Sequence, residues 1–250
     1  FPDITYSFYS VWADLYRIPY EKQKLDDNMK IVPEDYYKEN GGVIFPNPNA
    51  PTGLLMDLDS VRDIIEHNKD VVVIVDEAYI DFGGVSAKDL VNEYDNVLVV
   101  QTFSKSRSMA GMRIGYAFGS KELIKALNDV KFSFNSYTMN MTSIDMGVAS
   151  INDKKYFEEC VERITATRER TKEELTKLGF TFPDSKANFI FATHKSVSAK
   201  EIFEKLKEKN IFVRYFNQPL IDNYLRITIG TDEQMEKLYA ALEEITGQVK

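Results

Sequence analysis

The segment from Val71 to Val75 constrains the fold more than any other part of this sequence. It contains five consecutive β-branched residues, and Asp76 and Glu77 follow it directly. An uninterrupted run of this kind is typical of a strand that is covered on both faces, as in a parallel sheet. The run therefore predicts a central parallel strand in an α/β fold, with acidic side chains at its carboxyl end.

Shorter apolar segments predict the neighbouring elements of a large first domain. Strands are expected at 43–45, 97–100 and 114–118, and helices at 7–16, 59–68 and 121–130, with helix and loops over 26–39. The connection between the strands at 71–75 and 97–100 is expected to be mostly helical or loop. Strand, helix and strand at this spacing predict a βαβ unit with a right-handed crossover.

The downstream part of the chain has a different character. A long charged helix is predicted over 153–178, ended by Gly179, and Thr231 and Gln234 form a capping box that opens a last helix. Strands at 188–193, 211–215 and 224–229 and a helix at 199–209 complete this part. The chain is therefore expected to comprise a large domain over 1–148 and a smaller α+β domain over 149–250.

Composition excludes several classes of partner. The net charge of −8 argues against a nucleic-acid partner, because phosphate binding needs a basic surface. No stretch of 18 apolar residues is present, so no membrane span is expected. The single cysteine, Cys160, excludes an internal disulfide and fits a reducing compartment such as the cytoplasm. No metal site is expected, and both histidines, His67 and His194, are expected at the surface.

Lys105 is the leading candidate for a chemical role. It comes after the strand at 97–100 and directly follows a short segment that contains Thr102 and Ser104. Arg113 lies eight positions after Lys105. One interpretation is a solvated basic loop after a strand. The other places an amine at the carboxyl end of a strand, where open α/β sheets bind ligands. A lysine there can form a Schiff base with a carbonyl cofactor, and the hydroxyls and the arginine can bind a phosphate, which together favour pyridoxal phosphate.

Four motifs occur in order along the chain. They are Asn-Pro-Asn-Ala-Pro-Thr-Gly at 47–53, Val-Asp-Glu-Ala-Tyr at 75–79, Thr-Phe-Ser-Lys at 102–105 with Arg113, and Tyr-Leu-Arg-Ile-Thr-Ile-Gly at 224–230. Together they resemble the fold-type I pyridoxal-phosphate aminotransferases, in particular the histidinol-phosphate aminotransferases. The resemblance implies an α/β fold with a mostly parallel sheet, a smaller C-terminal domain and a homodimer.

The resemblance also implies roles around the cofactor. Lys105 resembles the lysine that binds the cofactor and later moves a proton, and Asp76 the carboxylate that pairs with the ring nitrogen. Tyr79 resembles a hydrogen-bond donor to the ring's phenolic oxygen. Without the resemblance, Asp76 would be interpreted as an N-cap and Tyr79 as a core residue. The other expected cofactor contacts are Tyr6 by stacking, Asn49, and Thr102, Ser104 and Arg113 at the phosphate.

A second set of residues resembles the substrate site of the family. Arg226 matches the arginine that binds the substrate carboxylate, and Asn188 lies near that carboxylate. Arg214 is expected at the distal phosphate of the substrate, the alternative being a surface charge on a strand. Tyr137 resembles a residue that reaches the active site of the neighbouring subunit.

Two departures from the family pattern matter. Ala50 stands where the family commonly has an asparagine that contacts the phenolic oxygen, so this contact is lost or taken over by Asn49. The family's first part, with a glycine-rich phosphate-binding loop, has no counterpart here. The large domain is therefore expected to be incomplete at its N-terminus, and the chain is expected to be a piece of a longer protein.

The resemblance predicts an exchange of the amino group between histidinol phosphate and 2-oxoglutarate, giving imidazole-acetol phosphate and glutamate in histidine biosynthesis. A threonine-phosphate decarboxylase or an aromatic aminotransferase shares the cofactor motifs and remains an alternative. A catalytically incompetent fragment is the alternative from a different class.

Overall fold

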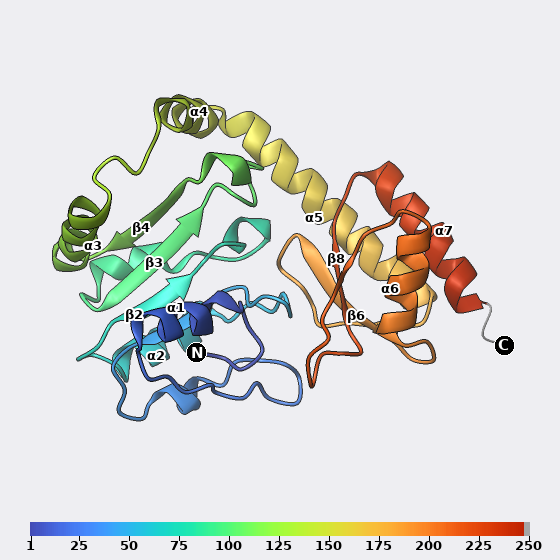
Figure 1. Cartoon of the computed structure of the whole chain (residues 1–250), viewed down its shortest axis with the longest axis horizontal. Coiled ribbons are helices and arrows are strands. Elements are labelled where there is room, and N and C mark those ends of the chain that lie inside the picture. The colour runs from blue at the N-terminus through green and yellow to red at the C-terminus, as the bar shows by residue number, and fades with distance from the viewer. Residues whose placement is uncertain (248–250) are drawn as a thin grey trace.

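The computed structural model describes residues 1–247 and contains two β-sheets, each with its own hydrophobic core (Figure 1). The first sheet has the strand order β1 (Val43–Pro46), β2 (Val73–Asp76), β3 (Val97–Thr102) and β4 (Gly115–Gly119). The first three strands are parallel and β4 is antiparallel to β3. The predicted α/β class and its four strands are confirmed, and the parallel strands end at one edge of the sheet.

The two faces of this sheet are covered unequally. Helix α2 (Leu58–Glu66) packs Val61, Ile64 and Ile65 against the face that carries Val73 and Val75, and all of these side chains are buried. On the opposite face Ile74 is only half-buried. The prediction that the central strand is covered on both faces is therefore wrong for the face that carries Ile74. A cavity lies between this face and α1 (Phe8–Tyr16).

Two predicted helical regions contain no α-helix. Between β2 and β3 the chain forms only the 3₁₀ segments η2 (Ile80–Phe82) and η3 (Ala87–Asn92), so the crossover of the expected βαβ unit has no α-helix. Residues 26–39 contain only η1 (Pro33–Tyr36). There the carboxylate of Asp26 accepts the backbone N–H groups of Asn28 and Lys30. Such local bonds satisfy the backbone in a turn and compete with a helix.

Three helices lead from the first sheet to the second. They are α3 (Lys121–Phe134), α4 (Met141–Asn152) and α5 (Lys154–Lys177), and α5 crosses from one sheet to the other (Figure 1). Helix α4 was not predicted, and the proposed domain limit at 148/149 falls inside it. Gly179 has a left-handed φ of 85°, as expected for the residue that ends α5.

The second sheet is antiparallel, with the order β5 (Phe180–Thr181), β6 (Phe189–His194), β8 (Leu225–Thr228) and β7 (Arg214–Tyr215). Helices α5, α6 (Ala199–Glu208) and α7 (Asp232–Gly247) contribute to its core. The capping box is confirmed, because the Gln234 N–H donates to Thr231 Oγ1 and the Thr231 N–H to Gln234 Oε1. The strand predicted at 211–215 is shorter than expected. No helix within residues 1–247 is both long and apolar enough to cross a membrane.

The surface position expected for His194 is wrong. Its side chain is buried, and Nδ1 accepts the N–H groups of Ser196 and Val197 in the turn after β6. Nε2 lies 3.0 Å from the Leu178 carbonyl oxygen. The histidine therefore joins this turn to the end of α5, whereas His67 is exposed as expected.

Candidate active site

The parallel strands bring three of the predicted motifs to one edge of the first sheet. The turn 47–53 follows β1, Asp76 ends β2, and residues 102–105 follow β3. Backbone bonds join these ends, since the Asn47 N–H donates to the Asp76 carbonyl and the Glu77 N–H to the Val100 carbonyl, each at 2.8 Å. The predicted residues Asn49, Asp76 and Lys105 thus lie at or just after the ends of neighbouring strands.

Asp76 is a half-buried carboxylate at the centre of this edge. Tyr9 Oη donates to its Oδ2 at 2.7 Å, and the Ala78 N–H donates to its Oδ1 at 3.1 Å. Burial raises the pKa of Asp76, while these two hydrogen bonds and the charge of Lys105 act in the opposite direction. The same burial, together with the negative charge of Asp76, raises the pKa of Tyr9, so that tyrosine keeps its proton and acts as a donor.

Lys105 lies beside both Asp76 and Tyr79. Its Nζ is 5.4 Å from the centroid of the Tyr79 ring, and its charge acts on the Asp76 carboxylate. The turn that carries Lys105 is fixed by the next residue, since the buried Ser106 hydroxyl donates to Asp81 at the start of the segment after β2. The structure therefore places an amine, a carboxylate and a phenol together.

Hydroxyl groups line the start of this turn. Thr102 Oγ1 accepts the Ser104 N–H at 3.1 Å and lies 2.9 Å from Ser104 Oγ. It also lies 3.1 Å from the carbonyl oxygen of Ile114, the residue after Arg113. Arg113 is exposed and has a left-handed φ of 55°, and its Nη1 donates to the Ala110 carbonyl at 3.1 Å. The hydroxyls and the arginine thus lie on adjoining turns.

Asn49 fixes the segment that carries Tyr6. Its Oδ1 accepts the Thr5 hydroxyl at 2.9 Å and its Nδ2 donates to the Ile4 carbonyl at 3.0 Å. Both ends of the buried amide are therefore engaged with residues 4–5. Tyr6 remains exposed and its ring packs against Phe8, Tyr9 and Trp12.

Arg226 approaches the same region from the second sheet. Its guanidinium Cζ lies 5.1 Å from the centroid of Phe189, and Phe189 in turn packs edge-on against Tyr79 with ring centroids 5.1 Å apart. Arg226 Nε is buried and has no hydrogen-bond partner within the described residues. Asn188, half-buried, directly precedes Phe189. The Phe189 ring thus lies between Tyr79 and a half-buried arginine whose buried Nε has an unused donor.

Arg214 is the direct cross-strand partner of Arg226. The two guanidinium carbons lie 5.4 and 5.9 Å from the centroid of the same ring, that of Phe216. Arg214 is exposed, whereas Arg226 is half-buried. Two like charges on opposite positions of a strand pair destabilise it, and an anion between them would relieve the repulsion.

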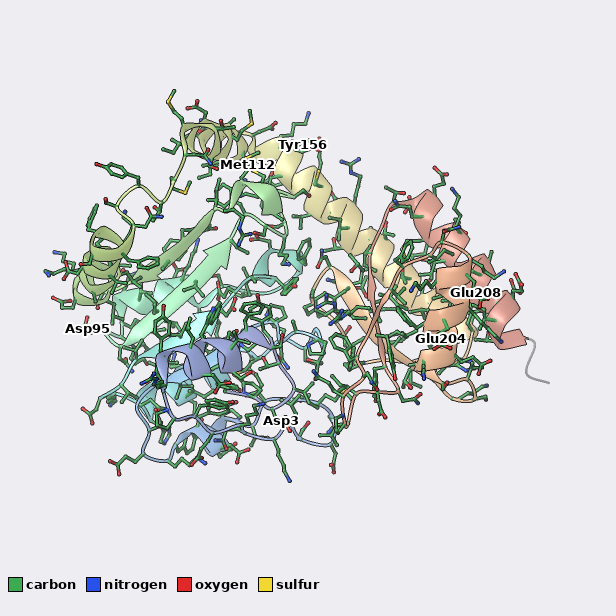
Figure 2. All side chains as sticks on the ribbon, viewed as in Figure 1. Asp3, Asp95, Met112, Tyr156, Glu204 and Glu208 are labelled. Carbon is green, nitrogen blue, oxygen red and sulfur yellow. The ribbon has the colours of Figure 1, made fainter. Side chains whose placement is uncertain are left out.

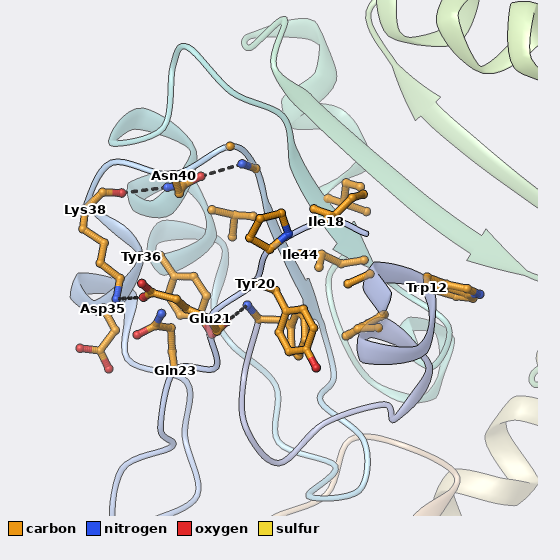
Figure 3. A pocket seen from close by; sticks show the side chains of 18 of the residues that line it. Trp12, Ile18, Tyr20, Glu21, Gln23, Asp35, Tyr36, Lys38, Asn40 and Ile44 are labelled. Atoms are coloured by element: carbon orange, nitrogen blue, oxygen red, sulfur yellow. Dashed lines mark hydrogen bonds and ion pairs between the residues drawn. The ribbon is translucent and has the colours of Figure 1, made fainter. Parts of the chain in front are cut away.

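Tyr137 is not brought together with the other candidates. It lies between α3 and α4, and 91% of its surface is exposed. A cavity of about 780 Å³ adjoins the site at Tyr9. Figure 3 shows Trp12, Ile18, Tyr20 and Ile44 around it, and of the residues at the candidate site only Tyr9 contributes to its lining.

The sequence pattern indicates no role at this site for two of its residues, Tyr9 and Ser106. Tyr9 fits the predicted first helix as an apolar position, and Ser106 belongs to no motif. The sequence offers one weak signal for Tyr9, its position close to Tyr6 at the start of the predicted helix.

Comparison with known proteins identifies the family of this chain. The family model for aminotransferase class I and II matches residues 1–242. The histidinol-phosphate aminotransferase of Clostridium beijerinckii is 54% identical over 98% of this chain and 68% of its own length. Among solved structures, that of the histidinol-phosphate aminotransferase of Clostridium acetobutylicum has a TM-score of 0.91 at 25% identity, covering 98% of this chain and 76% of the other.

The fold is shared with a more distant structure that was solved with a ligand. The histidinol-phosphate aminotransferase of Sinorhizobium meliloti in complex with pyridoxal-5'-phosphate has a TM-score of 0.89 at 20% identity, covering 100% of this chain and 70% of the other. The family model and the relative at 54% identity both extend across the two sheets and the helix that joins them. The chain belongs to the aminotransferase class I and II family.

Proposed function

We propose that this chain belongs to an enzyme that exchanges an amino group between histidinol phosphate and 2-oxoglutarate in histidine biosynthesis, with pyridoxal phosphate as its cofactor. The observation that carries the proposal is the position of Lys105 beside both the ring of Tyr79 and the half-buried carboxylate of Asp76. The relatives at about 50% identity bear the name of this activity. Because the proposed reaction belongs to a biosynthetic pathway, we expect the enzyme to act in the cytoplasm.

The residues at the edge of the first sheet fit pyridoxal phosphate chemically. An aldehyde requires a primary amine, which Lys105 offers, and a protonated ring nitrogen requires a carboxylate, which Asp76 offers. The phosphate requires donors and positive charge, which Thr102, Ser104 and Arg113 offer on adjoining turns. Tyr6 offers an exposed aromatic face for the ring.

When bound, this cofactor supplies an electron-withdrawing ring that stabilises negative charge at the substrate carbon. The chain's own residues do the rest. Lys105 would bind the aldehyde, and as a free amine it would move a proton to and from the substrate carbon. Asp76 would keep the ring nitrogen protonated, and the hydrogen bond from Tyr9 orients that carboxylate. Tyr79 is the proposed donor to the ring's phenolic oxygen.

The proposed contact of Asn49 to the phenolic oxygen is constrained by its present partners. An amide nitrogen carries two hydrogens, of which the Ile4 carbonyl takes one. The remaining hydrogen is the one available to the cofactor. The oxygen of Asn49 is oriented by Thr5.

Arg226 and Arg214 are the proposed anion site for both substrates. The substrate 2-oxoglutarate presents a carboxylate beside its reacting carbon, whereas histidinol phosphate has none there and presents a phosphate instead. Both anions suit the unused buried Nε of Arg226. Arg214, the exposed neighbour across the strand pair, is proposed to contact the distal phosphate, and Asn188 to lie near the carboxylate.

We also propose a homodimer. Large apolar side chains are exposed over α3, α4 and the segment between them. A surface of this kind marks an interaction site in soluble proteins. Tyr137 lies in this region and is proposed to reach the neighbouring subunit's site. The most exposed of these side chains are Val130, Phe132, Phe134, Tyr137, Met141, Ile144, Met146, Val148 and Ile151.

The activity is tested by offering purified protein and pyridoxal phosphate three substrates in parallel. Formation of glutamate from 2-oxoglutarate is measured with histidinol phosphate and with aromatic amino acids, and release of CO₂ is measured with threonine phosphate. The proposal expects kcat/KM for histidinol phosphate to exceed the others by at least about tenfold. Preferred decarboxylation of threonine phosphate, or preferred transfer from an aromatic amino acid, would contradict it.

A further inference from the structure

A single buried arginine connects the two sheets beside the candidate active site. Arg168 lies in α5 with only 4% of its surface exposed. Its Nη1 donates to the Phe82 carbonyl at 2.7 Å and to the Ala187 carbonyl at 3.0 Å. Its Nε donates to the Glu169 carboxylate at 2.8 Å. One nitrogen therefore bridges two backbone carbonyls, one in the segment after β2 of the first sheet and one just before β6 of the second sheet.

Each bridged carbonyl is close in sequence to a residue of the candidate site. Phe82 ends the 3₁₀ segment that follows Tyr79, and the Phe82 N–H donates to the Tyr79 carbonyl. Ala187 directly precedes Asn188, and Phe189 follows as the ring that lies between Tyr79 and Arg226. The bridge thus links the cofactor side of the site to its substrate side.

Lys172 joins Glu169, one partner of Arg168, to the segment that leads into β6. Lys172 Nζ donates to Glu169 and, at 2.6 Å, to Asp184 in the segment that leads into β6. Gly83, beside the bridged Phe82, has a φ of 134°, and a Cβ there would come within 3.6 Å of Arg168 Nη2. Gly83 therefore lies next to the guanidinium, at a distance that leaves room for ordinary van der Waals contact. Figure 2 shows that side chains fill the region where the two sheets meet.

We propose that Arg168 is a positioning residue for the amino transfer, holding the β6 entry, and with it Asn188 and Arg226, at a fixed place relative to Tyr79 and Lys105. This inference rests on the function proposed above. The planar guanidinium offers several donors in fixed directions, whereas a lysine offers a point charge on a flexible stem. A lysine at this position keeps the charge and loses the fixed bridge.

The test compares Arg168→Lys and Arg168→Met with a matched control, Arg170→Met. Arg170 lies on the same helix, and its ion pairs to Asp232 and Glu236 on α7 stay within the second sheet's domain. Three quantities are measured on the holoenzyme: the steady-state constants, the amount of cofactor retained, and the hydrogen exchange of peptides covering 185–191 and 76–82.

A displacement of about 1 Å between reacting groups can lower a rate a hundredfold. Because the bridge is proposed to position Asn188 and Arg226, which are the proposed substrate-binding residues, we expect Arg168→Lys to lower kcat/KM by at least about tenfold, mainly through KM, and Arg168→Met to lower it further. Cofactor retention should stay within about twofold of wild type, and exchange over 185–191 should rise at least about tenfold. Arg170→Met should leave both kcat/KM and exchange over 185–191 within about twofold of wild type.

Several results would overturn the inference. One is an unchanged kcat/KM and unchanged exchange over 185–191 in Arg168→Lys. Another is loss of cofactor in proportion to activity, or failure of both Arg168 variants to fold, since either assigns the arginine a purely structural role. Wild-type protein without amino transfer contradicts the proposed function instead, and the exchange measurement then decides the bridge alone.

Discussion

Asp76 illustrates how a site residue can lower the stability of the protein that contains it. Its carboxylate is half-buried, and the lost contact with water is compensated by the Tyr9 hydroxyl, one backbone N–H and the nearby charge of Lys105. Because its pKa is raised in the folded state, the folded protein binds this proton more tightly than the unfolded chain. The resulting stability is present at low pH and is lost as the pH rises through the raised pKa.

Asp76→Asn is therefore expected to separate stability from activity. The amide oxygen can accept the Ala78 N–H and its nitrogen can donate to the Tyr9 oxygen, so no buried charge remains. At pH 7 the cofactor-free variant should have a Tm no lower than wild type, while kcat falls by about a hundredfold. Calorimetry and the amino-transfer assay measure the two effects. A less stable variant with wild-type turnover would contradict both parts of this interpretation.

Substitutions of the paired arginines, Arg226 and Arg214, are expected to change kcat/KM differently for the two substrates. Arg226 is half-buried with a free donor, and Arg214 is its exposed cross-strand partner. Arg226→Ala should lower kcat/KM for both histidinol phosphate and glutamate by at least about tenfold, the cost of a lost charged hydrogen bond. Arg214→Ala should affect mainly histidinol phosphate. Equal losses for both substrates in Arg214→Ala would remove the assignment of this residue to the phosphate.

At the scale of the elements, the turn after β1 touches the entry to β6 through Gly53. A Cβ on this glycine would lie 2.2 Å from Ser185 Oγ and 3.1 Å from Ser185 Cα, and the backbone has a φ of 75°. The Lys186 N–H donates to the Gly53 carbonyl at 2.8 Å. Close backbone approach and a left-handed conformation both require glycine here.

Gly53→Ala should consequently lower the free energy of unfolding by about 2–4 kcal/mol, combining the left-handed backbone with the overpacked contact. It should also reduce amino transfer, because β6 carries Phe189. Gly41→Ala is the matched control, since a Cβ there meets nothing within 4 Å. Denaturant unfolding gives the stabilities, and equal values for the two variants would show that the close approach is unimportant.

The helices and strands differ in how clearly the local sequence pattern indicates them. The strands at 43–45, 71–75 and 97–100 were recognisable because their apolar runs face a core. The crossover after β2 was not, because its Glu77 bonds to Ser86, Ala87 and Gln101, contacts that favour a compact loop over a helix. Such bonds join residues far apart in sequence and leave no periodic signal.

The residues of the candidate site could be predicted from the sequence where a motif coincides with the end of a strand. Asp76, Tyr79 and Lys105 follow buried strands, and the parallel arrangement brings strand ends together. Tyr9 and Arg168 were not predictable in these roles, since their partners lie 67 and 86 residues away. An arginine in a charged helical pattern looks like a solvated residue until tertiary packing buries it.

The exposed apolar surface over α3 and α4 gives a prediction about assembly. Met146→Glu should shift the protein from dimer to monomer in sedimentation velocity, because a charge is costly in a buried apolar contact. Val85, a similarly exposed apolar residue outside this surface, provides the control variant Val85→Glu. A monomeric wild type, or a dimer that withstands the change at Met146, would contradict the proposed interface.

Peptide mapping after borohydride reduction tests whether Lys105 binds the cofactor covalently. Wild-type protein incubated with pyridoxal phosphate, reduced and digested should carry the phosphopyridoxyl group on Lys105. Lys105→Ala should carry none and should show no amino transfer. The modification found at another lysine in wild type, or amino transfer in Lys105→Ala, would contradict the account.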